Sequence, residues 1–344
     1  MRGSVTTNTP RAAGILLLLL GCWVVPPALA QPASLSDPRN GISMRLVRDD
    51  GLNADFYFKP SDKPQRALVM LGGSEGGKSW SAHPAHLQQL MDQGYCVLSL
   101  AYFAAEGLPD GLRAIPLEYF AKAFHWLSTQ KEVRPGDYAV LGASRGAELA
   151  LLLGSKYPDI KTVVAIAPSC VVFPGPPTGV WDTLRGQHSA WNFGGKELPF
   201  VPIPYSWTSL RGMVTGNRTR MFEDALLNTR AVQAAAIPVE TTRGPILLVS
   251  FSRDQVWPST RMSNQLMRRL DDARYPFPHE HRVFDTTHSN WSIEPCWSKI
   301  LAFLKNTASP GSLGTNAPAG GNQSVRPETN RPPAAPAYDR RAER

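Results

Sequence analysis

One serine in the chain lies between glycines in the pattern that presents a nucleophile. The segment Gly142-Ala143-Ser144-Arg145-Gly146 has the form G-x-S-x-G. An apolar run, Tyr138–Leu141, precedes it, and an Ala/Leu-rich stretch with helical character follows it. A strand that delivers the serine and a helix that begins directly after it are the context of a nucleophile elbow. The alternative interpretation is a strand-to-helix turn that merely contains a serine.

A serine hydroxyl needs a base to accept its proton, and the base needs a carboxylate to orient it. In folds with this elbow the acid and then the histidine follow, each on a loop after a later strand. Asp254 follows the apolar run Ile246–Ser250, and His288 follows the run Arg282–Phe284. We therefore predict Ser144 as nucleophile, Asp254 as orienting acid and His288 as base.

Other residues of the same types compete for these roles. Asp254 could instead cap the helix that follows it. Asp285 lies three residues before the predicted base and is expected to shape the turn. His279 and His281 fall before or within the last predicted strand, where we expect stem or surface residues, and we expect His125 to be a core histidine on an apolar helix.

Two backbone N–H groups are needed to stabilise a tetrahedral oxyanion. The residue after the nucleophile supplies one, which predicts Arg145. The other is expected in the loop after the apolar run Ala67–Leu71, where we place it at Ser74 or Glu75 within Gly72-Gly73-Ser74-Glu75-Gly76-Gly77. A phosphate-binding loop is the competing interpretation, but Gly77-Lys78-Ser79 does not open a helix, since the next helical stretch begins at Pro84.

The elements that must position these residues alternate along the chain. Short apolar runs are separated by longer helical stretches, as at Cys96–Leu100, Leu117–Gln130 and Thr162–Ala167. Such strands indicate a mostly parallel sheet covered by helices on both faces, with sites beyond the carboxyl ends of the strands. The sequence therefore predicts an α/β fold.

A long stretch, about residues 171–243, interrupts this alternation. Its aromatic residues are separated by Pro and Gly rather than placed at helical spacing; they include Phe173, Trp181, Trp191, Phe193, Phe200, Tyr205 and Trp207. One interpretation is a lid that covers the serine and forms an apolar pocket for an acyl chain. The other is a loop that packs on itself around a small core.

The two ends of the chain differ in character from the rest. Arg2 and Arg11 precede an apolar run of fourteen residues, 12–25, and a small-x-small site ends at Ala30. This predicts a signal peptide over residues 1–30, cleaved after Ala30, because a spanning helix needs ~20 apolar residues. A lipoprotein signal that ends at Cys22 is the alternative, and both predict export, to a periplasm or beyond.

Composition sets further bounds. The 344 residues are 42% hydrophobic, which suits one catalytic domain over residues 31–307 and excludes a mostly disordered chain. Residues 308–344 are rich in Pro, Gly and Ala, which is typical of a disordered tail. The formal net charge is +8, but the basic residues are scattered, so we predict no nucleic-acid partner.

The cysteines indicate neither a metal site nor a disulfide framework. Four are present, and Cys96 lies in an apolar run where we expect a buried thiol. A bridge between Cys170 and Cys296 is possible in an oxidising compartment. Because no Cys-x-x-Cys pair or His-rich spacing occurs, we predict no metal and no cofactor.

Several further strings accompany these motifs: Leu100-Ala101-Tyr102-Phe103, Glu106-Gly107-Leu108-Pro109, Ile115-Pro116-Leu117-Glu118-Tyr119-Phe120, Ile237-Pro238-Val239-Glu240 and Trp257-Pro258-Ser259. With the glycine-rich loop and the elbow, they resemble the C-terminal catalytic domain of the acyl-CoA thioesterase and bile acid-CoA:amino acid N-acyltransferase family, from about Ala67 to Leu304. The resemblance implies an α/β-hydrolase fold and carries a Ser/Asp/His triad onto Ser144, Asp254 and His288.

The sequence also departs from the family pattern. Acyltransferases of the family usually have Cys as nucleophile, so Ser144 favours transfer of the acyl group to water. Residues 31–60 are too few for the N-terminal β-sandwich domain of the eukaryotic enzymes, and Thr287 stands where a Gly often precedes the histidine. An exported chain would also not meet cytoplasmic CoA esters.

These observations predict a serine hydrolase that cleaves small-molecule acyl esters or thioesters through an acyl-enzyme. The first alternative is an acyltransferase that passes the acyl group to an amine. The second is a non-catalytic binding protein built on the hydrolase scaffold. Neither a nucleic-acid partner nor a membrane span is expected.

Overall fold

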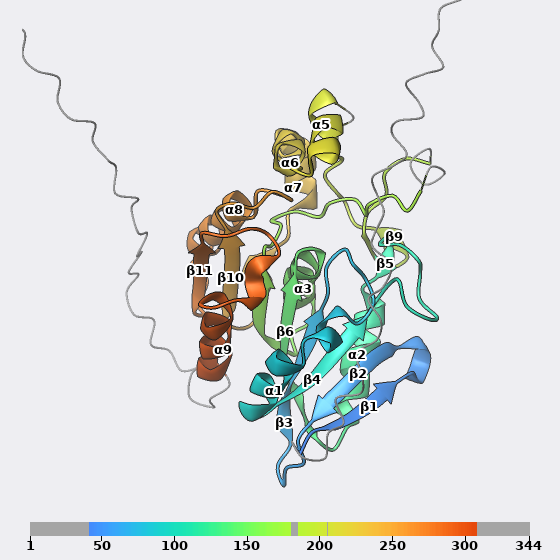
Figure 1. Cartoon of the computed structure of the whole chain (residues 1–344), viewed down its shortest axis with the longest axis vertical. Coiled ribbons are helices and arrows are strands. Elements are labelled where there is room, and N and C mark those ends of the chain that lie inside the picture. The colour runs from blue at the N-terminus through green and yellow to red at the C-terminus, as the bar shows by residue number, and fades with distance from the viewer. Residues whose placement is uncertain (1–40, 180–184, 205, 308–344) are drawn as a thin grey trace, which may run out of the picture. The chain divides into compact units, whose positions relative to one another are not determined.

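The computed structural model describes residues 41–179, 185–204 and 206–307 (Figure 1). The predicted signal peptide, the alternative lipid site at Cys22 and the predicted tail lie outside the described residues.

An eight-stranded sheet runs through the described residues in the order β1-β2-β4-β3-β6-β7-β10-β11. Pairing is antiparallel from β1 through β2 to β4 and parallel across the other strands. This is the α/β-hydrolase fold, as predicted. The strands are β1 (Ser43–Val47), β2 (Asn53–Phe58), β3 (Gln65–Leu71), β4 (Tyr95–Ala101), β6 (Val133–Ala143), β7 (Ile160–Ile166), β10 (Ile246–Phe251) and β11 (His279–Phe284).

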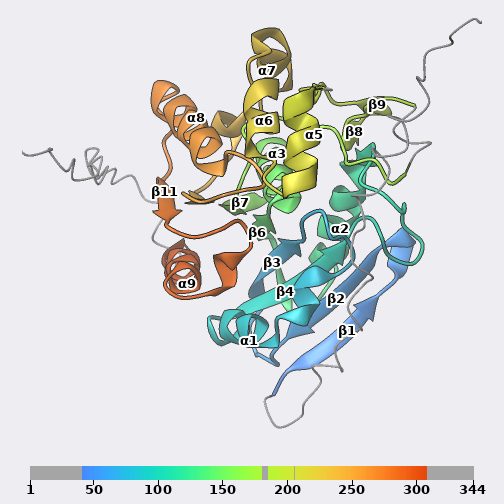
Figure 2. The same ribbon diagram turned by 45° about the horizontal axis from the view of Figure 1, so that its top comes forward.

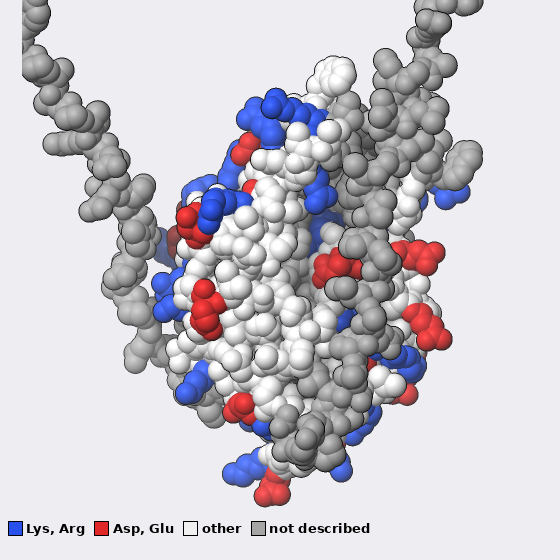
Figure 3. Space-filling view, in the orientation of Figure 1, with Lys and Arg blue, Asp and Glu red and all other residues white. Residues whose placement is uncertain are grey.

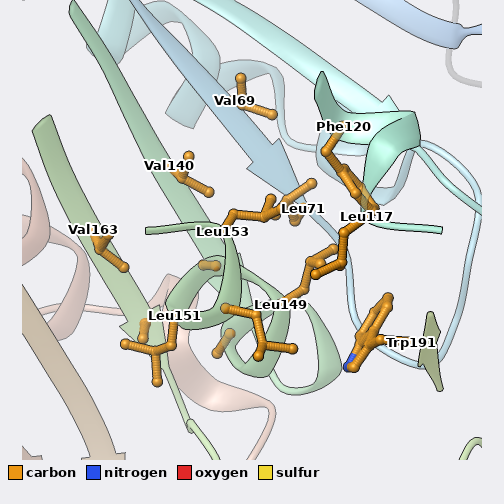
Figure 4. Close-up of a cluster of buried hydrophobic side chains, with 14 of the residues drawn as sticks. Val69, Leu71, Leu117, Phe120, Val140, Leu149, Leu151, Leu153, Val163 and Trp191 are labelled. Carbon is orange, nitrogen blue, oxygen red and sulfur yellow. The ribbon is translucent and has the colours of Figure 1, made fainter. Parts of the chain in front are cut away.

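Helices cover both faces of the sheet because alternate residues of its apolar strands point to opposite sides. Val69 and Leu71 of β3 belong to one buried cluster, and Leu68 and Met70 belong to another. The first cluster includes α2 (Glu118–Ser128), α3 (Arg145–Lys156) and α8 (Ser259–Asp272), and the second includes α1 (Pro84–Asp92) and α9 (Cys296–Thr307). Figure 4 shows Val69, Val140 and Val163, from three neighbouring strands, in the first cluster with leucines of α3.

The interrupting stretch contains its own short elements. In a second, three-stranded sheet, β8 (Trp191–Phe193) pairs with β5 (Ile115–Pro116) and with β9 (Lys196–Glu197). Three helices follow, α5 (Trp207–Thr215), α6 (Thr219–Ala225) and α7 (Thr229–Ala235), which lie together in Figures 1 and 2. Four short 3-10 turns complete the described elements, at Asp49–Gly51, Ser79–Ala82, Val239–Thr241 and Asn290–Ser292.

The aromatic residues of this stretch divide between core and solvent. Phe173 and Trp191 are fully buried in the first cluster, whereas Trp207 is 84% exposed and Phe193 is 42% exposed. Trp181 and Tyr205 lie outside the described residues. Part of the stretch is therefore built into the main core rather than packed only on itself.

The cysteines of the described residues are all buried and free. The expectation for Cys96 is confirmed, but the possible bridge between Cys170 and Cys296 does not form, and the Cys170 thiol instead donates to Gln265 Oε1 at 2.8 Å. No helix in the part of the chain that the structure describes is long and apolar enough to cross a membrane. On the face drawn in Figure 3, basic and acidic side chains are interspersed around a broad uncharged area.

Candidate active site

Ser144 occupies a sharp turn between β6 and α3. Its backbone has φ 55° and ψ −118°, a region that a non-glycine residue rarely adopts. The turn leaves no room for side chains: a Cβ on Gly142 would lie 2.0 Å from the Gly146 carbonyl oxygen. A Cβ on Gly146 would lie 2.3 Å from the Gly72 carbonyl oxygen. The two glycines therefore allow the strand, the helix and the neighbouring loop to meet at the serine.

Three side chains from distant parts of the sequence meet at this turn. His288 Nε2 lies 3.0 Å from Ser144 Oγ, and His288 Nδ1 lies 2.9 Å from each carboxylate oxygen of Asp254. His288 is 9% exposed, so little water competes for these contacts. The order β6-β7-β10-β11 explains the meeting, since parallel strands bring their carboxyl ends to one edge.

The Asp254 carboxylate is held by further donors. It accepts hydrogen bonds from the backbone N–H groups of Val256 and Trp257, at 2.9 and 3.2 Å, and from Ser259 Oγ at 2.6 Å. Asp254 thus binds the turn that starts α8 as well as the imidazole. The capping role considered as an alternative coexists with the contact to His288.

The competing residues lie elsewhere. His279 Nε2 lies 3.1 Å from Asp271, and His281 Nε2 lies 2.7 Å from Ser250 Oγ, where burial lowers the pKa of His281 to about 4. Asp285 has an 80% exposed side chain and pairs with Arg253. The expectation that His125 lies in the core was wrong: the residue is exposed, on the solvent side of α2.

The glycine-rich loop reaches the serine through Gly73. A Cβ placed on Gly73 would lie 3.1 Å from Ser144 Cβ, so its backbone lies directly against the nucleophile. The Gly73 N–H donates to Glu75 Oε1 at 2.8 Å, and both Ser74 and Glu75 are exposed. Gly73 was not among the predicted donors. Its position two residues after β3, the neighbour of β6, was the signal that could have found it.

Buried hydrogen bonds hold this loop in place. Tyr102 Oη donates to the Gly72 carbonyl at 2.5 Å, and Trp80 Nε1 donates to the Leu71 carbonyl at 3.0 Å. Lys78 and Asp55 form an ion pair at 2.5 Å with both side chains largely buried. The loop is therefore positioned by groups outside it as well as by its own residues.

An aromatic wall adjoins the imidazole. The Trp257 ring lies 6.1 Å from the His288 ring, and Phe173 lies 6.1 Å from Trp257 and 4.9 Å from Phe222, by ring centroids. Phe173 and Phe222 belong to the interrupting stretch, so that stretch reaches the residues around the histidine. Within the described ranges, no group of three His, Cys, Asp or Glu residues is arranged to hold a metal ion.

Comparison with known proteins gives a family match and curated relatives. Residues 115–288 match the family described as BAAT / Acyl-CoA thioester hydrolase C terminal. The chain is 23% identical over 309 residues to acyl-coenzyme A amino acid N-acyltransferase 2 of Rattus norvegicus, covering 86% of this chain and 68% of that protein. It is 28% identical over 239 residues to acyl-coenzyme A thioesterase 1 of Homo sapiens, covering 67% of this chain and 50% of that protein. The chain thus spans about half the length of that thioesterase.

Solved structures share the fold at low sequence identity. The Pyrococcus furiosus esterase Pf2001 is 15% identical, with a TM-score of 0.51 over 80% of this chain and 98% of that one. A Mycobacterium tuberculosis puromycin-hydrolyzing peptidase is also 15% identical, with a TM-score of 0.56 over 83% of this chain and 41% of that one. At this identity the likeness concerns the architecture alone.

Proposed function

Because the chain belongs to the BAAT / acyl-CoA thioester hydrolase C-terminal family, we propose that it is a serine hydrolase that cleaves small-molecule acyl esters or thioesters. The observation that carries the proposal is the continuous contact from Ser144 Oγ through His288 to Asp254, with distances of 3.0 and 2.9 Å. A serine set on a strained turn and joined to a histidine whose other nitrogen meets a buried carboxylate is the arrangement that nucleophilic acyl transfer needs.

In the proposed reaction, Ser144 Oγ attacks the carbonyl carbon while His288 Nε2 accepts the hydroxyl proton. Asp254 holds the imidazole by Nδ1–H and stabilises the imidazolium that forms. The protonated imidazole then donates to the leaving alcohol or thiol, and an acyl-enzyme remains. Water, deprotonated by His288, attacks this ester, and collapse of the second tetrahedral intermediate returns the proton to Ser144 Oγ and releases the acid.

The negative oxygen of each tetrahedral intermediate needs preorganised donors. The Arg145 N–H lies at the start of α3, where backbone N–H groups have no partner within the helix. We assign the second donor to the loop after β3. Ser74 and Glu75 remain candidates there. The N–H of Gly73 is a third candidate, because Gly73 lies against Ser144, and a substrate oxygen would replace Glu75 as its acceptor.

We further propose that residues 171–243 act as the lid and shape an apolar acyl site. This is supported by the chain of ring contacts from Phe222 and Phe173 to Trp257 and on to His288. Of these three rings, that of Phe222 is partly exposed, so an acyl chain would bind against Phe222, with the buried Phe173 and Trp257 behind it, and would gain by burial of apolar surface.

Active-site labelling tests the hydrolase proposal. A fluorophosphonate should label the wild-type protein and not the Ser144→Ala variant, with both shown to be folded by circular dichroism. A panel of p-nitrophenyl esters and acyl-CoA thioesters of graded chain length then defines the leaving group and the acyl site. Absence of labelling in the folded wild type would reject the hydrolase and favour a non-catalytic binding protein.

Acyl transfer to an amine is the second candidate, favoured by the match to an amino acid N-acyltransferase over 86% of this chain. The presence of Ser rather than Cys at position 144 favours water as the acceptor. Product analysis with and without an amino acid acceptor separates the two, since an amide product appears only if the acyl-enzyme is intercepted by the amine.

Export is proposed from the sequence of the first thirty residues. The N-terminus of the mature protein tests it: a chain that begins at Gln31 supports cleavage after Ala30, and a lipidated chain that begins at Cys22 supports the lipoprotein alternative. A Met1 retained in the protein from its native host would contradict both.

A further inference from the structure

Two charged side chains are buried directly behind the nucleophile, and the proposed mechanism uses neither. Arg145 is 5% exposed and Glu148 is fully buried, and Arg145 Nη1 donates to Glu148 Oε2 at 2.7 Å. Both lie in the first turn of α3, immediately after Ser144. The Arg145 backbone N–H is the proposed oxyanion donor, so this side chain is attached to the residue whose backbone position matters most.

The pair makes its other contacts with the interrupting stretch. Arg145 Nη2 donates to the Phe173 carbonyl at 2.9 Å, and Trp191 Nε1 donates to Glu148 Oε1 at 2.6 Å. The guanidinium carbon also lies 6.0 Å from the ring centroids of both Trp191 and Trp257. Figure 4 shows Trp191 beside the first turns of α3. This ion pair therefore connects three parts of the structure: the turn at Ser144, the start of residues 171–243 at Phe173, and the three-stranded sheet at Trp191.

Stability is a poor explanation for such a pair. Removing two charges from water is costly, and replacing a buried ion pair with packed apolar residues is often neutral or stabilising. What an ion pair with fixed hydrogen bonds does provide is a single geometry, because each donor and acceptor must find its partner. Breaking one contact shifts the others.

We propose that Arg145 and Glu148 form a positioning pair that holds the Arg145 backbone N–H in place for the oxyanion and fastens the stretch at Phe173 and Trp191 over Ser144. This rests on the proposed serine-hydrolase function. Neither side chain is assigned a contact with the substrate, and both act through the backbone and the aromatic wall.

The ionisation of Glu148 gives this proposal a distinctive signature. Burial raises the pKa of Glu148 to about 7, opposed by Arg145, Trp191 and a backbone hydrogen bond from Phe173. Tyr102 and Cys170 are the other titratable groups that interact with this carboxylate. The carboxylate is charged above about pH 7 and protonated below it, so the ion pair is complete only on the alkaline side.

The test compares the labelling rate of Glu148→Gln with that of the wild type from about pH 5.5 to about pH 8.5, a range that lies on both sides of this ionisation. Gln resembles the protonated carboxyl, so its rate of fluorophosphonate labelling should match the wild type at the acid end. At the alkaline end, the labelling rate and the kcat of Glu148→Gln should each be about tenfold below those of the wild type, with KM nearly unchanged. The reason is that the variant lacks an interaction made mainly in the transition state. A purely structural role would lower the rate at every pH.

Two further variants keep the test decisive. Trp191→Phe removes one hydrogen bond and leaves the ion pair, and it should lower kcat by a smaller factor even if Glu148→Gln fails to fold. Glu240→Gln breaks the partly buried pair with Arg269 and serves as the matched control, with an expected rate equal to that of the wild type.

The outcomes separate this inference from the proposed function. Labelling of the wild type with equal alkaline rates in Glu148→Gln, or an unchanged kcat in Trp191→Phe when Glu148→Gln does not fold, would overturn the positioning pair and leave the hydrolase standing. Failure of the folded wild type to label at all would overturn both.

Discussion

Asp254 has two simultaneous tasks, and its replacement separates them. Its carboxylate accepts a hydrogen bond from His288 Nδ1 at 2.9 Å and also accepts hydrogen bonds from the backbone N–H groups of the turn that starts α8. Asp254→Asn keeps the size of the side chain but offers its own N–H to the ring, which favours the wrong imidazole tautomer. We expect kcat to fall by roughly 10⁴-fold with the fold intact, measured by steady-state hydrolysis of a p-nitrophenyl ester.

Asp285→Asn is the control for this change. The residue is on the same rim of the sheet, but its side chain is 80% exposed and pairs with Arg253. Its turnover should stay within about twofold of the wild type, as for most surface substitutions. A large loss in Asp285→Asn together with a near-normal Asp254→Asn would transfer the orienting role to Asp285.

The sequence predicts those site residues whose position follows from the order of the strands. Asp254 and His288 could be proposed because each follows an apolar strand, and the carboxyl ends of parallel strands share an edge. The partners of Glu148 could not be proposed. Their importance depends on which segment covers α3, and no local sequence pattern expresses that.

At the scale of elements, the joint between β6 and α3 is the least tolerant part of the site. Gly146→Ala would place a Cβ 2.3 Å from the Gly72 carbonyl and 2.4 Å from the Leu71 carbonyl, both of them backbone atoms that cannot turn aside. Relief requires α3 to move away from β3 and carry the Arg145 N–H with it. We expect a loss of about 1–3 kcal/mol in stability and of at least ~100-fold in kcat.

Denaturant unfolding and ester hydrolysis check these two effects. If Gly146→Ala kept the stability and the kcat of the wild type, the close contact between helix and loop would not be required for the reaction.

The elements themselves were predictable to different degrees. The strands and helices of the main sheet have apolar runs with clear spacing, so the helix predicted directly after Ser144 is present as α3, Arg145–Lys156. The elements within residues 171–243 were not foreseen, because β9 has two residues, α6 and α7 have seven each, and Pro and Gly separate them. Contacts with the main core, such as those of Trp191, stabilise these short elements, and such contacts leave no periodic signal.

For the molecule as a whole, the buried Glu148 and the partly buried His281 change the pH dependence of stability in opposite directions. Burial lowers the pKa of His281 from 6.5 to about 4, so the unfolded chain binds a proton that the folded chain refuses, and this term makes stability rise with pH across that window. Burial raises the pKa of Glu148 from 4.5 to about 7, so the folded chain keeps a proton that the unfolded chain loses, and this term makes stability fall with pH. The two terms oppose each other wherever the windows overlap.

The free energy of unfolding of the wild type should therefore vary little with pH between 4.5 and 6.5 on account of these two groups. His281→Gln removes the rising term, so its stability should fall with pH relative to the wild type. Glu148→Gln removes the falling term, so its stability should rise relative to the wild type, in each case by at most ~1.4 kcal/mol per pH unit. Urea unfolding at several pH values measures all three curves. The three proteins share every other titrating group. Parallel curves of stability against pH would therefore mean that neither ionisation is linked to folding, because both side chains would then titrate in the folded protein as they do in the unfolded chain.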